Sequence, residues 1–223
     1  MRVLLLTVAC AAVAFGQAAK EANKGYQTKE ARAGLASVLD NPGRDARQKP
    51  AELVESLGVR PGSTVIDLGT GPGYMLPYLS RAVGPNGHVI AQDIQADFLD
   101  RARAKAGREG LKNIEFVLGT DSDPRLASGS ADLILVLDAY HHFDYPDRML
   151  AAFRRALREG GRLAIVEYYK RRGAMEGDPD RALTHIRLDA DDVVKEVEAA
   201  EFRLLSRREQ IPNSQYAAIF ERK

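Results

Sequence analysis

The stretch TVIDLGTGPGY, residues 64–74, decides the fold of this chain. Its first half, residues 65–68, is mostly β-branched or aliphatic and lies between a Pro-Gly pair and a run of glycines, which predicts a short buried strand. Its second half has glycine at alternate positions, Gly69, Gly71 and Gly73. Because glycine has no Cβ, such a turn can bend tightly and bring the backbone close to a ligand. At the end of a parallel strand, this turn lies in the crevice where open α/β sheets bind ligands.

The spacing of these glycines separates two kinds of cofactor site. The dinucleotide fingerprint G-x-G-x-x-G places its third glycine three positions after the second, whereas Gly73 follows Gly71 at two. An acidic residue, Asp67, lies in the strand just before the turn. The pattern Asp-x-Gly-x-Gly-x-Gly resembles the first motif of the class I methyltransferases that use S-adenosylmethionine (SAM). The resemblance implies that the turn passes beside the amino-acid part of SAM and that Asp67 helps to orient it.

Strand and helix patterns alternate along the rest of the chain. Apolar runs predict strands at 88–93, 114–118, 131–138 and 163–168, and a terminal pair at 202–207 and 215–220. Helical patterns are found at 28–39, 44–58, 74–83, 95–107, 145–158 and 189–200. The alternation predicts a Rossmann-like, doubly wound α/β sheet of seven strands, mostly parallel with an antiparallel last strand.

Three parts are expected along the chain: 1–16 as a signal peptide or anchor, 17–60 as an N-terminal helical cap, and 61–223 as the SAM-binding methyltransferase domain. The first part has a basic start and about 13 apolar or small residues, too few for a membrane span of about 20 residues. It is typical of a secretory signal peptide, with cleavage expected before Gln17. A cleaved chain would be periplasmic or secreted, with no stable membrane span, and an uncleaved chain would be membrane-anchored or cytoplasmic.

The composition narrows the class of protein. The chain has 223 residues, 45% hydrophobic and 28% charged, as expected for one globular domain with appendages. A net charge of +1 argues against a nucleic-acid partner. The single cysteine, Cys10, would be lost on processing, which excludes a cysteine nucleophile and a cysteine relay for a metalloid substrate. We predict no metal site, and the sequence does not predict an oligomeric state.

Two further junctions extend the resemblance to the methyltransferases. Asp93 ends the second strand, 24 residues after Gly69, close to the roughly 20 expected for an acid that binds ribose hydroxyls. Its alternative role is an N-cap for the following helix. After the third strand, the family usually has Gly-Asp-Ala, and the acid or its neighbour meets the adenine amino group. Here Thr120 stands where the family has the Asp, and Asp121 follows one residue later, so Asp121 could instead form a turn.

The resemblance therefore implies a SAM site built from the strand ends and turns that follow them. The residues it assigns to cofactor binding are Asp67, Gly69, Thr70, Gly71, Gly73, Tyr74, Asp93, Ile94, Thr120, Asp121 and Asp138. Helices before the first strand often cover this site in the family. Tyr26, Gln48 and Lys49 are therefore candidate contributors, with solvated surface as the commoner alternative for each.

The segment DAYHHF, residues 138–143, follows the fourth strand, whose end faces the transferred methyl group in the resembling family. It lacks the Asn/Asp-Pro-Pro-aromatic signature of amide and adenine methylation, and it resembles the small-molecule branch. His141 or His142 could remove a proton from the acceptor, since imidazole titrates near neutrality. In an extended segment only one of two consecutive side chains faces the pocket. We assign the base to His142, with a structural hydrogen-bonding role as the alternative, and expect Asp138 to orient the acceptor or the histidine.

Other readings of the chain remain open. The loop 170–187 is polar and long enough for a lid, and His185 within it is either a second base or a surface histidine. The proposed reaction is in-line displacement of the SAM methyl group onto a small-molecule acceptor. The alternatives are an NAD(P)-dependent oxidoreductase, which the glycine spacing disfavours, and a non-catalytic exported protein that binds SAM or a nucleoside.

Overall fold

The computed structural model describes residues 18–223. The predicted signal peptide or anchor, 1–16, lies outside the described residues and stays a prediction. Among the helices that are described, none has both the length and the apolar character that crossing a membrane requires.

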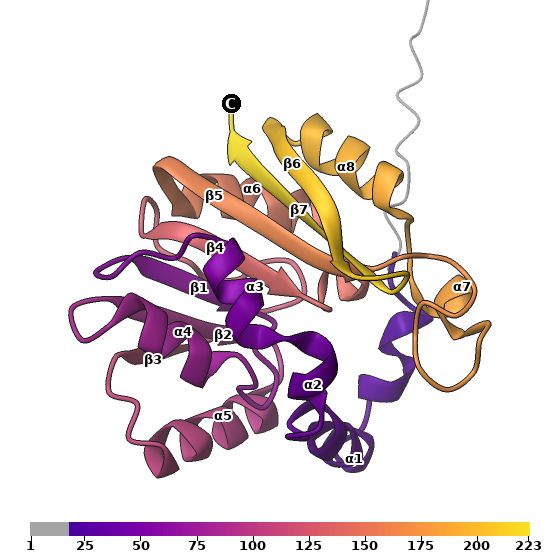
Figure 1. The fold of residues 1–223 in the computed structure, drawn as a ribbon, viewed down its shortest axis with the longest axis horizontal. Helices are drawn as coiled ribbons and strands as arrows, with labels where there is room; N and C mark the ends of the chain where they lie inside the picture. Colours follow the sequence, from indigo (N-terminus) through magenta and orange to yellow (C-terminus); the bar gives the residue numbers. More distant parts are fainter. Residues whose placement is uncertain (1–17) are drawn as a thin grey trace, which may run out of the picture.

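Within the described residues, seven strands form one sheet (Figure 1). They are β1 (Thr64–Leu68), β2 (His88–Asp93), β3 (Ile114–Leu118), β4 (Ala131–Leu137), β5 (Leu157–Tyr168), β6 (Phe202–Ile211) and β7 (Gln215–Arg222). Their order across the sheet is β3-β2-β1-β4-β5-β7-β6. The first five strands pair in parallel, and β7 is antiparallel to both of its neighbours. The predicted doubly wound fold, with an antiparallel last strand, is confirmed.

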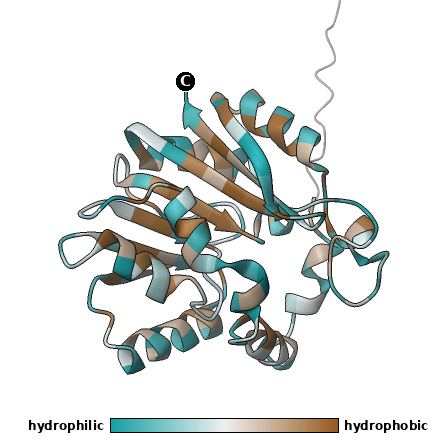
Figure 2. Cartoon of the chain, in the orientation of Figure 1, coloured by the Kyte–Doolittle hydropathy of each residue, from teal (hydrophilic) through white to brown (hydrophobic). Residues whose placement is uncertain are grey.

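Helices cover both faces of the sheet, because the central strands are apolar on both sides. One face packs against α3 (Pro50–Ser56), α4 (Leu76–Val83) and α5 (Ala96–Arg108). The other packs against α6 (Pro146–Ala156) and α8 (Ala190–Ala199). Figure 2 shows the hydrophobic residues concentrated in the sheet, with hydrophilic residues on the outer surfaces of the helices.

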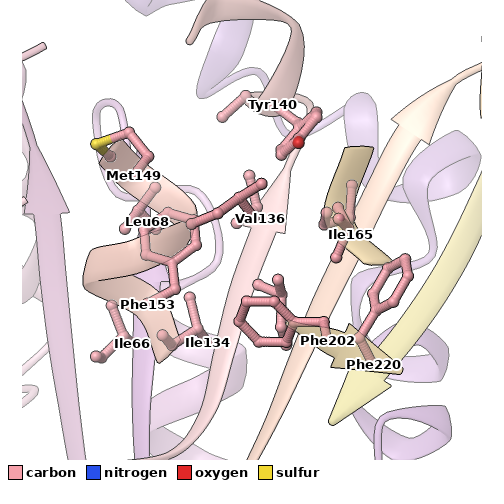
Figure 3. Close-up of a cluster of buried hydrophobic side chains, with 14 of the residues drawn as sticks. Ile66, Leu68, Ile134, Val136, Tyr140, Met149, Phe153, Ile165, Phe202 and Phe220 are labelled. Carbon is pink, nitrogen blue, oxygen red and sulfur yellow. The ribbon is translucent and has the colours of Figure 1, made fainter. Parts of the chain in front are cut away.

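Alternation along each strand divides the core into two clusters. In β1, Val65 belongs to the cluster under α3 and α4, whereas Ile66 belongs to the cluster under α6. Figure 3 shows this second cluster, where Ile66 and Ile134 lie close to Phe153 of α6. Both clusters are almost free of solvent, so the strand ends above them are held by a rigid core.

The segment before β1 forms a separate helical cap at the carboxyl edge of the sheet. It contains η1 (Ala22–Tyr26), α1 (Lys29–Leu39) and α2 (Arg44–Gln48). Thr28 caps α1, because its side chain accepts a hydrogen bond from the Ala31 amide. The predicted helix 44–58 is broken at Lys49, which adopts a left-handed φ of 48°. Proline disfavours helical backbone in the residue before it, so the chain turns at Lys49 and restarts as α3 at Pro50.

Three local expectations are corrected. The strand predicted at 163–168 is longer: β5 begins six residues earlier, at Leu157, and pairs with β4 through a register shift. The loop 170–187 contains a short helix, α7 (Arg181–His185). The segment after β4 is not extended, because η2 (Tyr140–His142) makes it a 3₁₀ turn.

We expect Gly73→Ala to destabilise the protein more than Gly62→Ala. Both glycines have a positive φ, 92° and 83°, where alanine costs about 1–2 kcal/mol. A Cβ on Gly73 would lie 2.9 Å from Leu76 Cδ1 and 3.1 Å from Ala102 Cα, whereas a Cβ on Gly62 meets nothing within 4 Å. Overpacking should therefore add about 1–3 kcal/mol at Gly73 alone. Urea unfolding of both variants measures the difference, and equal losses would contradict the packing of this turn.

Candidate active site

A cavity of about 440 Å³ lies at the carboxyl edge of the sheet, where β1, β2 and β4 end. This volume is within the range of about 300–1,000 Å³ typical of small-molecule sites. The cap covers it with side chains from η1, α1 and α2. The predicted site residues that line the cavity are Gly69, Thr70, Gly71, Tyr74, Asp93, Ile94, Thr120, Asp121, Asp138 and His142.

Hydrogen bonds tie the glycine turn to the end of β2. The amides of Gly69 and Thr70 both donate to the Gln92 carbonyl oxygen, each at 2.9 Å. The Gly71 amide donates to Oδ2 of Asp93 at 2.8 Å. The turn and the acid that were predicted to share one ligand therefore lie in direct contact.

Asp93 is held so that its carboxylate keeps capacity for a ligand. Besides the Gly71 amide on Oδ2, its Oδ1 accepts the Gln95 amide at 2.8 Å. A carboxylate offers about four acceptor sites, so capacity remains for a ligand. Burial raises the pKa of Asp93 to about 6. The N-cap of α5 is Gln95, not Asp93, so the alternative role considered for Asp93 is not observed.

Two residues predicted to bind the cofactor lie behind the cavity wall. Asp67 is buried, and its Oδ2 accepts a hydrogen bond from the Thr70 hydroxyl at 2.7 Å. Burial raises the pKa of Asp67 to about 6. Asp67 thus acts on the cavity through Thr70, which lines it. Gly73 is also buried, against Leu76 and Ala102.

The end of the cavity beside β2 and β3 combines apolar and polar groups. Ile94 is 45% exposed although it is aliphatic, and it lies on the cavity. Thr120 lies beside it, with its hydroxyl accepting the Asp123 amide at 3.0 Å, and Asp121 is exposed. The amide nitrogen Nε2 of Gln92, also on the cavity, is buried and has no hydrogen-bond partner among residues 18–223. This end can therefore accept a flat base with polar edges.

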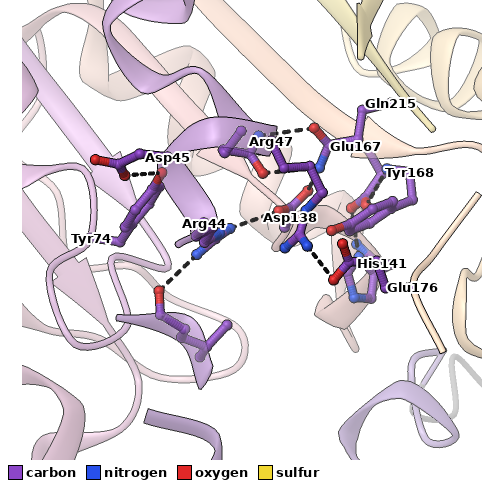
Figure 4. A network of polar contacts seen from close by, with 12 residues as sticks. Arg44, Asp45, Arg47, Tyr74, Asp138, His141, Glu167, Tyr168, Glu176 and Gln215 are labelled. Carbon is purple, nitrogen blue, oxygen red and sulfur yellow. Dashed lines mark hydrogen bonds and ion pairs between the residues drawn. The ribbon is translucent and has the colours of Figure 1, made fainter. Parts of the chain in front are cut away.

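The cap is fastened to the sheet at Asp138 (Figure 4). Arg44 Nη2 of α2 lies 2.8 Å from one carboxylate oxygen, and Gln215 Nε2 of β7 donates to the other at 2.6 Å. The Arg44 guanidinium also lies 4.3 Å from the Tyr74 ring centre, as a cation–π contact. Gln48 is buried and donates to Gln215 at 2.9 Å. The candidate contributors in the cap thus differ: Tyr26 lines the cavity, Gln48 is buried beside it, and Lys49 does neither.

The two consecutive histidines meet at one place. The 3₁₀ turn η2 brings the rings of His141 and His142 to 4.0 Å between centres, although only His142 lines the cavity. His185 of α7 lies 4.9 Å from the first ring and 5.5 Å from the second. His142 lines the cavity and packs against Tyr26, with 4.7 Å between ring centres.

Polar partners, of which Glu167 is fully buried, fix the orientation of both rings. His141 Nδ1 lies 2.6 Å from the carboxylate of Glu167, the penultimate residue of β5. His142 Nδ1 lies 2.8 Å from the side-chain oxygen of Asn23 in η1. Burial, with further contributions from the two other histidines, lowers the pKa of His142 well below its ordinary value. Burial and the neighbouring His141 lower the pKa of His185 to about 4. The imidazoles of His142 and His185 are therefore neutral at pH 7.

Sequence reasoning missed three residues of this site: Arg44, Asn23 and Glu167. They come from the cap and from β5, far from the motif around the glycine turn. No spacing rule links them to it. The one available signal is chemical, since Glu167 is a charged residue directly after the apolar run 163–166.

Comparisons with known proteins agree with this geometry. Residues 65–161 match the family described as a methyltransferase domain. The chain is 33% identical over 118 residues to the ubiquinone/menaquinone biosynthesis C-methyltransferase UbiE of Hahella chejuensis. The aligned region covers 52% of this chain and 47% of that protein. It is 33% identical over 107 residues to the arsenite methyltransferase of Halobacterium salinarum, covering 48% of this chain and 27% of that protein. The chain thus spans less than half the length of these curated relatives.

The similarity to a solved structure is more extensive. A SAM-dependent methyltransferase from Aquifex aeolicus aligns with a TM-score of 0.77 and 27% identity, over 84% of this chain and 96% of that one. Together with the domain match, this alignment supports the assignment of the chain as a SAM-dependent methyltransferase, with SAM as its cofactor.

We expect Arg44→Ala to cost about 3 kcal/mol of unfolding free energy, because it leaves the Asp138 carboxylate buried without its charged partner. Both side chains of this pair are 11% exposed. Arg158→Ala is the matched control, since its pair with Asp132 is 44% and 35% exposed and should contribute less than about 1 kcal/mol. Urea unfolding gives both values. Similar losses would show that the cap is not fastened through Asp138.

Proposed function

We propose that this chain transfers the methyl group of SAM to an organic small-molecule acceptor by in-line displacement. The observation that carries the proposal is the carboxylate of Asp93, fixed by the Gly71 amide at the cavity with acceptor capacity left for a ligand. The two ribose hydroxyls of SAM suit such a carboxylate, because each can donate one hydrogen bond.

The other cavity residues suggest how the rest of the cofactor lies. The exposed face of Ile94 suits the adenine ring, and Thr120 or Asp121 suits its amino group. The backbone of the glycine turn and Thr70, held by Asp67, suit the amino-acid part. This assignment puts the sulfonium between the glycine turn and the end of β4.

The acceptor is proposed to enter beside η2. The cavity wall there combines apolar Phe143 and Met149 with polar His142, Asn23 and Asp144. Methyl transfer needs no covalent enzyme intermediate, so the protein contributes mainly by aligning the acceptor with the methyl group and excluding water. Proximity of this kind is worth roughly 7–11 kcal/mol. The cap, which covers the cavity, serves both purposes.

The cysteine content restricts the acceptor class. One relative is named for arsenite, yet the single cysteine of this chain, Cys10, lies outside the described residues and away from the motifs of the site. Without a thiolate relay we do not extend arsenite methylation to this chain, and an organic acceptor is proposed instead. The assignment of His142 as a base stays a prediction.

We expect Asp93→Ala to weaken SAM binding by about 1–3 kcal/mol, because hydrogen bonds to a charged acceptor are lost. Asp100→Ala is the matched control, since Asp100 is exposed on α5 and does not line the cavity. Isothermal titration calorimetry with SAM measures both affinities. An unchanged affinity in Asp93→Ala would remove its ribose role, and binding of NAD(P)H in preference to SAM would favour the oxidoreductase.

SAM binding should also weaken on acidification. The ionised form of Asp93 binds the hydroxyls, and burial places its pKa at about 6, so protonation below this pH competes with the ligand. Affinity should be nearly constant above about pH 7 and fall, by up to about tenfold per pH unit, below pH 6. Calorimetry at constant ionic strength between pH 7.5 and about 5 tests this, with Asp93→Asn as the variant that should lose most of the dependence. A flat profile in the wild type would contradict the role of the carboxylate.

A further inference from the structure

Three of the four histidines of this chain gather at one place, and two separate segments contribute them. His141 and His142 come from η2, after β4, and His185 comes from α7, between β5 and α8. One ring nitrogen of each lies within 4.8 Å of the other two. The fourth histidine, His88, is the first residue of β2, at the end of that strand away from Asp93 and the cavity, and its side chain is half exposed.

The hydrogen bonds identify which nitrogens are free. A carboxylate only accepts, so His141 Nδ1 donates its hydrogen to Glu167. Asn23 uses its Nδ2 to donate to the His142 carbonyl oxygen and to Asp144, which directs its Oδ1 toward His142 Nδ1. Nδ1 therefore carries the hydrogen in both rings, and Nε2 is the nitrogen that each ring can offer to a metal ion. Neither Nε2 has a hydrogen-bond partner within residues 18–223, and the His185 ring has none there either.

The partners on Nδ1 are those found around metal-binding histidines. Such residues usually donate their second ring N–H to a carboxylate or a carbonyl-type oxygen, which fixes the ring and makes the ligating nitrogen more basic. Glu167 does this for His141, and three N–H groups in turn hold its carboxylate: the His141 ring, the His141 amide at 3.2 Å and the Tyr168 amide at 2.7 Å. Asn23 does the same for His142.

We propose that His141, His142 and His185 bind one divalent transition-metal ion at the acceptor end of the cavity. Three imidazoles with an open fourth position are the donor set of catalytic zinc sites, and imidazole also suits Co²⁺, Ni²⁺ and Fe²⁺. At a metal–nitrogen distance of about 2.1 Å, tetrahedral ligands lie about 3.4 Å apart. The histidine nitrogens must therefore approach by up to about 1.4 Å from the 4.8 Å limit, through rotation of side chains or movement of α7.

Charge at the site favours a cation. Glu167 contributes a buried carboxylate, whereas the nearby Asp138 is already paired with Arg44. Arg181, one turn before His185, is the opposing charge close to the cluster, and its residue is exposed to solvent. Solvent weakens the repulsion from an exposed guanidinium, whereas the Glu167 carboxylate acts from a buried position.

The site bears on the proposed function and rests on it for its role. His142 is both a member of the cluster and part of the cavity wall, so the open position of the ion would be reached from the acceptor side. An acceptor bound there through an oxygen would lose its proton more readily, because the ion stabilises the anion. A metal on Nε2 of His142 excludes that atom as a free base, so the two roles are mutually exclusive.

Direct metal titration of the full chain, without a histidine tag, tests the proposal. After chelator treatment, Co²⁺ should bind with one equivalent and produce visible absorption bands of a nitrogen-coordinated tetrahedral ion, and Zn²⁺ should displace it. His185→Ala should weaken Zn²⁺ binding by more than about 100-fold. Glu167→Gln, which keeps the shape of the side chain beside His141, should weaken it by about 10–100-fold. His88→Ala is the matched control and should bind like the wild type.

Several outcomes would overturn the site. The proposal fails should the wild type bind no Co²⁺ at millimolar concentration, or should His185→Ala and His88→Ala bind Zn²⁺ with equal affinity. Circular dichroism checks that each variant is folded, and His142→Ala replaces His185→Ala should the latter not fold. Calorimetry with SAM on the metal-free protein is measured separately. Loss of metal binding with intact SAM binding rejects this site alone, whereas metal binding without SAM binding rejects the proposed function alone.

Discussion

The contact between the glycine turn after β1 and the end of β2 is the constraint on which the site depends. Parallel pairing sets Asp67 beside Ala91 and Leu68 beside Gln92, so the two chains leave the sheet at the same level. The Gln92 carbonyl and the Asp93 carboxylate then accept three successive amides of the turn. These bonds fix the carboxylate before any ligand arrives, and a preorganised acceptor binds without an additional ordering cost.

The cap depends on a second convergence, at the end of β4. Asp138 receives Arg44 from the beginning of the described chain and Gln215 from β7 near its end. Because such a pair is stable in low dielectric only when both charges are present and hydrogen-bonded, the cavity cover and the last strand are coupled through one carboxylate. The left-handed Lys49 lets α2 lie over the cavity while α3 remains in the core.

Much of this architecture could be predicted from the sequence, because its determinants are local. The bounds of β2 and β3 were predicted without error, since their apolar runs end at turns or an acid. That Gly71 and Asp93 lie at one cavity followed from the order of the motifs. The cap contacts could not be predicted, because Arg44 and Asn23 meet the site only through tertiary packing. The histidine cluster was missed for a geometric reason: three residues of 3₁₀ turn replaced the extended segment, and His185 lies more than 40 residues away along the chain.

The division of the cavity between two parts of the chain has an evolutionary consequence. Its base, formed by the turn and strand ends, falls within residues 65–161, whereas Tyr26, Arg32 and Arg44 on its cover precede them. These cover residues take no part in the hydrogen bonds that join the glycine turn to the end of β2, although Arg44 pairs with Asp138. Ligand selectivity can therefore diversify among descendants of one ancestor while the chemistry at the strand ends is inherited intact.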